Sequence, residues 1–208
     1  MLDIHCHILP GVDDGARSLS ESIAMLDAAQ KAGITHVVCT PHMRWADFSP
    51  EAIDRAFESL LPHAQSAGIE LILGYEVNWK KLAEVGLETA PQWVISGTNL
   101  FLLEFNDDSM PAQWQRLVKA LFDMGLQVVV AHPERYRDIQ KNIAIAEELK
   151  DLGCYLQLSA NFCSAGKREA PRKVAEELLR RDMVDYIASD AHRPEHYQLF
   201  TQALALAG

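Results

Sequence analysis

Histidine and carboxylate side chains fall where apolar stretches of this chain end. The first such place is MLDIHCHILPGVDDG at residues 1–15, where His5 and His7 stand two positions apart. In a β-strand, residues i and i+2 point to the same face, so the two imidazoles would project together and Cys6 would face the other way. Two imidazoles are too few to hold a metal ion. The pair alone therefore fits a surface histidine pair equally well.

Seven apolar stretches predict the strands that must position such ligands. They are rich in β-branched and aliphatic residues, as is typical of strands buried on both faces in a parallel sheet. They lie at residues 2–7, 34–40, 69–76, 99–105, 126–132, 154–160 and 183–189.

The segments between these stretches predict crossover helices. Ser18 with Glu21 is a capping-box pattern, and Ser49 with Pro50 is an N-cap followed by proline at the first helical position. Glycines at 33, 68, 125 and 153 are expected to end helices. Seven βα units predict either a doubly wound sheet or a barrel with one unit fewer than the usual eight. With no linker or repeat, we predict a single domain over residues 1–208.

Potential metal ligands end six of the seven predicted strands. In a parallel barrel the carboxyl ends of the strands lie on one rim, where active sites are built. An unpaired carboxylate at the end of an apolar run would be costly to desolvate, and a metal ion removes that cost. These ligands are His5, His7, His42, Glu76, Glu104, His132, Asp190 and His192, and the remaining strand ends in Ser159 and Asn161.

Composition limits the class of protein. The chain has 208 residues, of which 49% are hydrophobic, enough for one substantial core. The net charge of −10 argues against a nucleic-acid surface. No apolar run approaches the roughly 20 residues needed for membrane insertion, and a structured motif from Asp3 leaves no room for a signal peptide. The four cysteines show no CxxC pairing and predict reduced thiols, so we expect a cytoplasmic protein.

Six motifs give the chain a recognisable pattern: DIHCHILPGVDDGA, VVCTPH, GYEVN, LLEF, AHPERY and ASDAH. Together they resemble the PHP (polymerase and histidinol phosphatase) superfamily, and most of all the bacterial manganese-dependent protein tyrosine phosphatases of capsule and exopolysaccharide operons. The resemblance runs from Met1 to about His192. It implies a distorted seven-stranded (β/α)7 TIM-like barrel with three metal ions on its carboxyl rim.

The resemblance also implies a ligand set. Nine ligands would serve three ions: His5, His7, Glu76 and Asp190 the first; Glu76, Glu104 and His132 the second; and Asp14, His42 and His192 the third. Oxygen and nitrogen donors suit Mn²⁺, our first choice, and also Fe, Zn, Co or Mg. Three divalent ions would outweigh the four carboxylates and leave a cationic pocket suited to phosphate.

The expected reaction is hydrolysis of a phosphomonoester, in which a hydroxide bridging the metal ions attacks phosphorus in line. Arg135 matches the family's phosphate-binding arginine, and Arg193 is a candidate for a second phosphate contact because the segment after His192 is shorter than in the family. Asn161 and His196 are candidates for the substrate rim. The expected substrate is the phosphotyrosine tail of a polysaccharide-biosynthesis tyrosine kinase. A thiol mechanism is excluded, because no cysteine is followed six positions later by arginine.

Three alternatives stay open at this point. A PHP phosphatase could act on a small phosphomonoester such as histidinol phosphate. A metal-dependent amidohydrolase or deoxyribonuclease-like hydrolase also begins with His-x-His, but usually has eight strands and a bridging lysine where this chain has Glu104. A partner-binding regulator could have kept a structural metal site. A homo-oligomer is compatible with each of these.

Overall fold

The computed structural model describes residues 1–106 and 108–208. The strands in these residues form two parallel sheets. One sheet has the strand order β1-β2-β4 and the other the order β3-β5-β6-β7-β8-β9. The strands are β1 (Leu2–Cys6), β2 (His36–Cys39), β3 (His42–Met43), β4 (Glu70–Leu73), β5 (Glu76–Asn78), β6 (Leu100–Glu104), β7 (Gln127–Ala131), β8 (Tyr155–Ser159) and β9 (Tyr186–Ala188). Each of the seven predicted stretches contains at least one of them.

Two of the predicted strands are divided in the structure: stretch 34–40 contains β2 and is followed by β3, and stretch 69–76 contains β4 and the first residue of β5. This accounts for the division into two sheets. Thr40 and Pro41 separate β2 from β3, and Pro41 has no N–H to donate to a sheet ladder. Across the break, the Gly74 N–H donates to the Cys39 carbonyl at 2.8 Å and the Glu76 N–H to the Pro41 carbonyl at 3.2 Å. The predicted α/β class with parallel strands is confirmed. In the described residues the strands form two sheets rather than one closed seven-stranded barrel.

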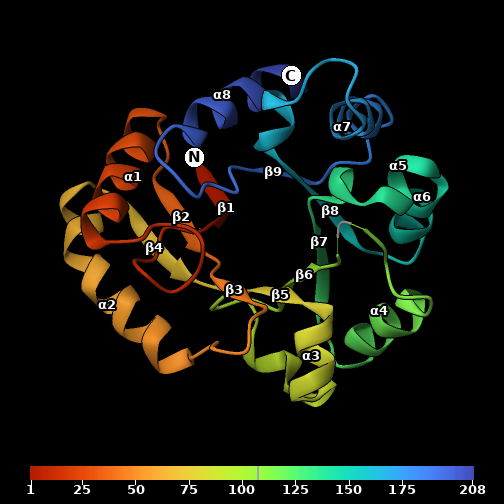
Figure 1. Cartoon of the computed structure of the whole chain (residues 1–208), viewed down its shortest axis with the longest axis horizontal. Helices are drawn as coiled ribbons and strands as arrows, with labels where there is room; N and C mark the ends of the chain where they lie inside the picture. The colour runs from red at the N-terminus through yellow and green to blue at the C-terminus, as the bar shows by residue number, and fades with distance from the viewer. Residues whose placement is uncertain (107) are drawn as a thin grey trace.

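The helices surround the strands and follow one another in chain order around the periphery (Figure 1). They are α1 (Leu19–Lys31), α2 (Pro50–Ser66), α3 (Trp79–Val85), α4 (Trp114–Asp123), α5 (Arg137–Lys141), α6 (Ala144–Asp151), α7 (Ala170–Arg180) and α8 (His196–Ala207), with 3-10 turns η1 (Leu87–Gln92), η2 (Pro133–Arg135) and η3 (Ala160–Ser164). No helix in the described residues is long and apolar enough to cross a membrane.

The predicted helix ends are confirmed. The Ser18 hydroxyl accepts a hydrogen bond from the Glu21 N–H at the start of α1, and the Ser49 hydroxyl accepts one from Ala52 N–H at the start of α2. The Glu21 carboxylate reaches back one residue further than a capping box requires, to the Arg17 N–H at 2.8 Å. Gly33 follows α1 with a φ of 79°, a left-handed conformation that glycine adopts without strain.

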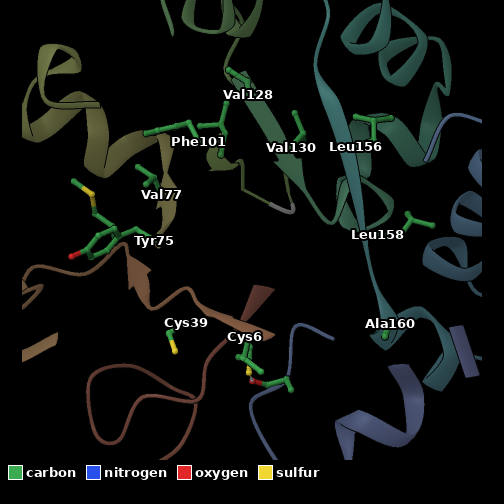
Figure 2. Close-up of a cluster of buried hydrophobic side chains, with 14 of the residues drawn as sticks. Cys6, Cys39, Tyr75, Val77, Phe101, Val128, Val130, Leu156, Leu158 and Ala160 are labelled. Carbon is green, nitrogen blue, oxygen red and sulfur yellow. Dashed lines mark hydrogen bonds between the residues drawn. The ribbon is translucent and has the colours of Figure 1, made fainter. Parts of the chain in front are cut away.

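Apolar side chains alternate along the strands between two clusters. Val128, Val130, Leu156 and Leu158 belong to the large cluster that also contains the buried helix side chains, and Figure 2 shows them on β7 and β8. The residue between the first two, Val129, belongs to a second, smaller cluster with Ile4, Val38, Leu102, Ala131 and Ala188. The strands are therefore buried on both faces, which explains why their sequences are continuously apolar.

The large cluster makes the fold sensitive to loss of core volume. Phe101 on β6 is fully buried within it (Figure 2). We expect Phe101→Ala to lower the free energy of unfolding by about 3–5 kcal/mol, because a cavity replaces buried ring surface. Leu61→Ala, at a side chain that is 40% exposed, should change it by no more than about 0.5 kcal/mol. Urea unfolding of both variants measures this, and equal effects would contradict this account of the core.

Candidate metal centre

His5 and His7 come together where β1 ends. The pairing of β1 with β2 shifts register between Asp3 and Cys6, which is a β-bulge or similar irregularity. Bulges re-aim side chains and often lie beside active sites. The Nε2 atoms of His5 and His7 lie 3.1 Å apart, while Cys6 is fully buried in the large apolar cluster. The predicted division, with the imidazoles on one side and Cys6 on the other, is confirmed.

Two carboxylates from distant segments approach this imidazole pair. Glu76 Oε2, at the start of β5, lies 3.2 Å from the Nε2 atom of each histidine. Asp190 Oδ1, which follows β9, lies 3.5 Å from His5 Nε2 and 3.4 Å from His7 Nε2. These are the four side chains expected around the first ion. All four are buried, so two imidazoles and two carboxylates share one enclosed space.

Glu76 also contacts the next group of predicted ligands. Its Oε1 atom lies 2.6 Å from His132 Nε2, and its Oε2 atom lies 2.9 Å from His42 Nδ1. One ligand atom each from His42, Glu76 and Glu104 can lie within 4.8 Å of one another. Glu76 is thus in contact with both groups, as a bridging carboxylate would be. His42 joins this group in addition to the third group, to which the resemblance assigned it.

The third group opens toward solvent. Asp14 Oδ1 lies 3.4 Å from His42 Nε2 and 3.4 Å from His192 Nε2. His7 lies beside the same group, with its ring stacked on His192 at 4.1 Å between centroids. The Asp14 side chain is 58% exposed, in contrast to the buried Glu76. A ligand from solvent would therefore reach the centre from the Asp14 side.

The chemistry of these donors fits divalent cations. His42 Nδ1 and Glu76 Oε2 are buried and close together, yet neither has a hydrogen-bond partner among the described residues. Burial raises the pKa of Glu104, and the nearby Glu76 carboxylate raises it further. Burial also opposes ionisation of Glu76, but His42 and His5 hold its pKa well below its ordinary value. Cations at this position would stabilise both carboxylates, as oxygen and nitrogen ligands are suited to do.

Backbone strain marks two of the candidate ligands. His132 and Asp190 have φ values of 35° and 47°, which non-glycine residues rarely adopt. His132 directly follows β7, Asp190 comes two residues after the end of β9, and each directs its side chain to the cluster. Such strain persists where the surrounding structure holds the residue in place, and it is concentrated at functional sites.

Asp13 contacts two of the candidate ligands and was not singled out from the sequence. Its Oδ2 atom accepts from His7 Nδ1 at 2.8 Å and from the His42 N–H at 3.1 Å, and its Oδ1 atom accepts from the Gly15 N–H at 2.9 Å. A proton on His7 Nδ1 leaves Nε2 free to coordinate, which is the usual arrangement of metal-binding histidines. The signal for it in the sequence is the adjacent pair of aspartates in VDDG, whose second member is Asp14.

Two further polar side chains also contact candidate ligands through the atoms that face away from the cluster. Gln157 Oε1 lies 2.8 Å from His5 Nδ1, and Asn78 Nδ2 donates to Glu104 Oε2 at 2.8 Å. Gln157 is a single polar residue between two buried leucines of β8, and that break in the apolar run was a usable signal. Together these contacts fix which ring nitrogen and which carboxylate oxygen face the cluster.

The predicted substrate-binding residues lie around the same rim, and they differ in which candidate ligand they contact. Arg135 Nη2 contacts the Asp190 carboxylate and donates to the Ser159 hydroxyl at 3.1 Å. Asn161 Nδ2 also donates to Asp190, at 3.4 Å. His196 Nδ1 accepts from the His192 N–H at 3.3 Å.

Arg193 lies further out. It is exposed and lines a cavity of about 190 Å³ together with Asp14 and His192. Arg44, which was not singled out from the sequence, approaches the centre more closely, with Nη1 3.1 Å from Glu104 Oε1. Its side chain is 41% exposed. It directly follows β3, in which His42 is the predicted ligand.

Parallel strands with converging imidazoles and carboxylates define an α/β protein with a candidate metal centre. The chain belongs to the CpsB/CapC family of capsular polysaccharide synthesis, whose family model matches residues 1–199. It is 30% identical over 206 residues to tyrosine-protein phosphatase YwqE of Bacillus subtilis, which covers 97% of this chain and 81% of YwqE. It is 31% identical over 211 residues to tyrosine-protein phosphatase CpsB of Streptococcus pneumoniae, which covers 95% of this chain and 87% of CpsB.

Solved structures are similar over the whole chain. A crystal structure from work on YwqE of Bacillus subtilis and CpsB of Streptococcus pneumoniae, described as metal-dependent tyrosine phosphatases, matches with a TM-score of 0.85 at 29% identity, covering 99% of this chain and 85% of that chain. A β-aspartyl dipeptidase from Fervidobacterium islandicum matches with a TM-score of 0.61 at 13% identity, covering 100% of this chain and 68% of that chain. The second likeness shows a shared fold alone.

The contacts of Asp13 predict that substituting it weakens metal binding although every candidate ligand is still present. In Asp13→Ala, His7 loses the acceptor that fixes its ring, and we expect Mn²⁺ affinity to fall by about 10- to 100-fold. Asp47→Ala is the matched control, because it removes the same charge from an exposed neighbouring position. Calorimetric titration of metal-stripped protein measures both affinities. If Asp13→Ala binds Mn²⁺ as tightly as Asp47→Ala, the positioning role of Asp13 is wrong.

Proposed function

We propose that this protein is a metal-dependent protein tyrosine phosphatase acting on a phosphotyrosine-bearing protein of capsular polysaccharide synthesis. The observation that carries the proposal is the convergence of His5, His7, Glu76, Asp190 and their neighbours into one buried set of nitrogen and oxygen donors. YwqE and CpsB, which match nearly the whole chain, are tyrosine-protein phosphatases, and this supports the reaction and the class of substrate. A tyrosine kinase tail is the substrate we favour.

The proposed metal centre uses the ligands expected from the sequence. Three divalent ions would be held by three sets of side chains, with Mn²⁺ our first choice: His5, His7, Glu76 and Asp190; Glu76, Glu104 and His132; and Asp14, His42 and His192. When bound, such ions supply Lewis acidity, which neutralises phosphate oxygens and makes water a stronger acid. Asp13 and Gln157 keep the His7 and His5 rings turned to the centre.

Side chains of the rim perform the remaining tasks in this proposal. Arg135 is close enough to Asp190 to bind a phosphate whose oxygens face the same centre, and its planar guanidinium can hold two of those oxygens at once. Arg193, Asn161 and His196 line the approach and contact the rest of the substrate. A phenolate leaves with little protonation help, so no dedicated acid is required. Cys6 takes no part, because burial raises the pKa of its thiol well above the ordinary value.

We also propose a barrel architecture and a cellular location. The chain is a single domain over residues 1–208. Its strands make a distorted seven-stranded barrel when β2 with β3 and β4 with β5 are each counted as one divided strand, a proposal supported by the ring of helices and by the parallel bridge between Cys6 and Ala191. A cytoplasmic location is supported by the four free cysteines, since oxidising compartments favour disulfides.

The test of this function compares substrates and two neighbouring variants. With added Mn²⁺, the protein should hydrolyse a phosphotyrosyl peptide with a higher kcat/KM than histidinol phosphate. His5→Ala should abolish turnover by removing a ligand, whereas Cys6→Ala should keep most of it. A preference for histidinol phosphate would favour the small-molecule alternative. Absence of turnover with either phosphate would contradict the phosphatase proposal and favour a regulator. Inactivity of a folded, metal-loaded Cys6→Ala would contradict the metal mechanism.

Arg135 should affect the transition state rather than the fold. We expect Arg135→Lys and Arg135→Ala each to lower kcat/KM by tenfold or more, about 1.4 kcal/mol upward, because lysine cannot reproduce the two-pronged grip. Arg137→Ala is the matched control, since that side chain is 65% exposed and pairs with Asp108. Steady-state kinetics with metal content measured in parallel checks this. Near-normal kcat/KM at normal metal content would transfer the role to Arg193.

A further inference from the structure

Trp45 is an exposed aromatic side chain beside the candidate metal centre. It is 37% exposed and is the one aromatic residue among the strongly exposed large apolar side chains in the described chain. Its ring meets the His42 imidazole edge-on, with 5.0 Å between centroids and an angle of 78° between planes. His42 lies within two of the ligand groups, so Trp45 stands at the edge of the centre itself.

Neighbouring contacts hold this segment in place. Arg44, the preceding residue, donates to Glu104 Oε1 at 3.1 Å, while Trp45 packs against His42. Two consecutive side chains thus contact two different candidate ligands. Apolar side-chain surface that is exposed to water costs free energy, and a ligand that covers this surface removes part of that cost. The position of the Trp45 indole beside the candidate metal ligands points to a molecule that binds from solvent and covers the indole.

A cavity next to Trp45 has room for such an occupant. It measures about 430 Å³ and is lined by Trp45 and Asp47 from one segment of the chain and by residues 11–14, Asp13 and Asp14 among them, from another. Cavities of about 150 Å³ hold a benzene molecule. Asp14 is at once a lining residue and a candidate ligand, so the cavity leads directly from the metal centre to the indole.

We infer that Trp45 provides the surface against which the aromatic ring of an aryl phosphate lies during hydrolysis. In an aryl phosphate a single ester oxygen separates the ring from phosphorus, so a ring whose phosphate occupies the centre must lie at its edge. The acidic side chains of Asp14 and Asp47 disfavour a second anionic group there, whereas a neutral ring can pack on the indole. The inference rests on the proposed phosphatase function and assigns Trp45 a part in its preference for aromatic over aliphatic phosphate esters.

A purely structural role for Trp45 makes a different prediction. If the indole only holds the His42 ring, removing it should disturb the metal centre and weaken every phosphate-like ligand equally. If it receives the substrate ring, its removal should weaken only ligands that carry a ring. Non-hydrolysable phosphonates separate the two roles without relying on turnover.

The experiment measures dissociation constants of benzylphosphonate and ethylphosphonate for the Mn²⁺-loaded full chain by calorimetry. Benzylphosphonate places a ring one atom from phosphorus, and ethylphosphonate carries the same charged group without a ring. We expect Trp45→Ala to weaken benzylphosphonate by about three- to tenfold. Ethylphosphonate binding and metal content should stay within about twofold of wild type. Trp45→Phe should restore most of the difference, and Leu152→Ala, at a remote side chain that is 40% exposed, should change neither constant.

Each outcome decides the inference separately from the proposed function. An unchanged ratio of the two constants in Trp45→Ala, or an equal loss for both phosphonates with lowered metal content, would overturn the role of Trp45. Phosphotyrosyl-peptide turnover by the wild-type chain would survive either result. Conversely, a wild-type chain without phosphatase activity would sink the proposed function, and a benzyl preference lost in Trp45→Ala would still support an aryl-binding surface.

Discussion

The convergence of four carboxylates and five imidazoles, all of them buried except Asp14 and His192, is the constraint on which the rest of this structure depends. Glu76 has no exposed surface, and its two oxygens face His5, His7, His42 and His132 at 2.6 to 3.2 Å. A buried carboxylate without a charged partner is costly, and its cost falls when cations share the space. The fold therefore has to bring these groups together and the chemistry of the centre has to keep them there.

The parallel strands accomplish this through their direction alone. Strands that run the same way have their carboxyl ends at the same edge, so side chains that follow a strand, such as His132, meet those that begin the short strands β3 and β5 beyond Cys39 and Leu73, regardless of their distance along the chain. Glu76 and His132 are 56 positions apart, yet their side-chain atoms lie 2.6 Å from one another. Strain at His132 and Asp190 is stored where the strand turns into a loop, and the apolar clusters below supply the stability that maintains it.

Much of this arrangement could be predicted from the sequence because it depends on local patterns. Apolar stretches predicted the strands, and the position of a histidine or an acid at the end of six of the seven stretches identified the cluster. What could not be predicted depends on pairing between distant segments. The partners of Arg135 and Arg44 are Asp190 and Glu104, and nothing in the local sequence of either arginine specifies them. The division into two sheets follows from breaks at Pro41 and Gly74, whose effect on a ladder depends on the neighbouring strand.

Metal stoichiometry tests the central claim most directly. Protein purified gently, without chelators, should contain more than one transition-metal ion per chain by elemental analysis. Removal of the metal should abolish phosphotyrosyl-peptide turnover, and added Mn²⁺ should restore it. A chain that is free of transition metal and still fully active would contradict the account, because the buried carboxylates would then have some other partner.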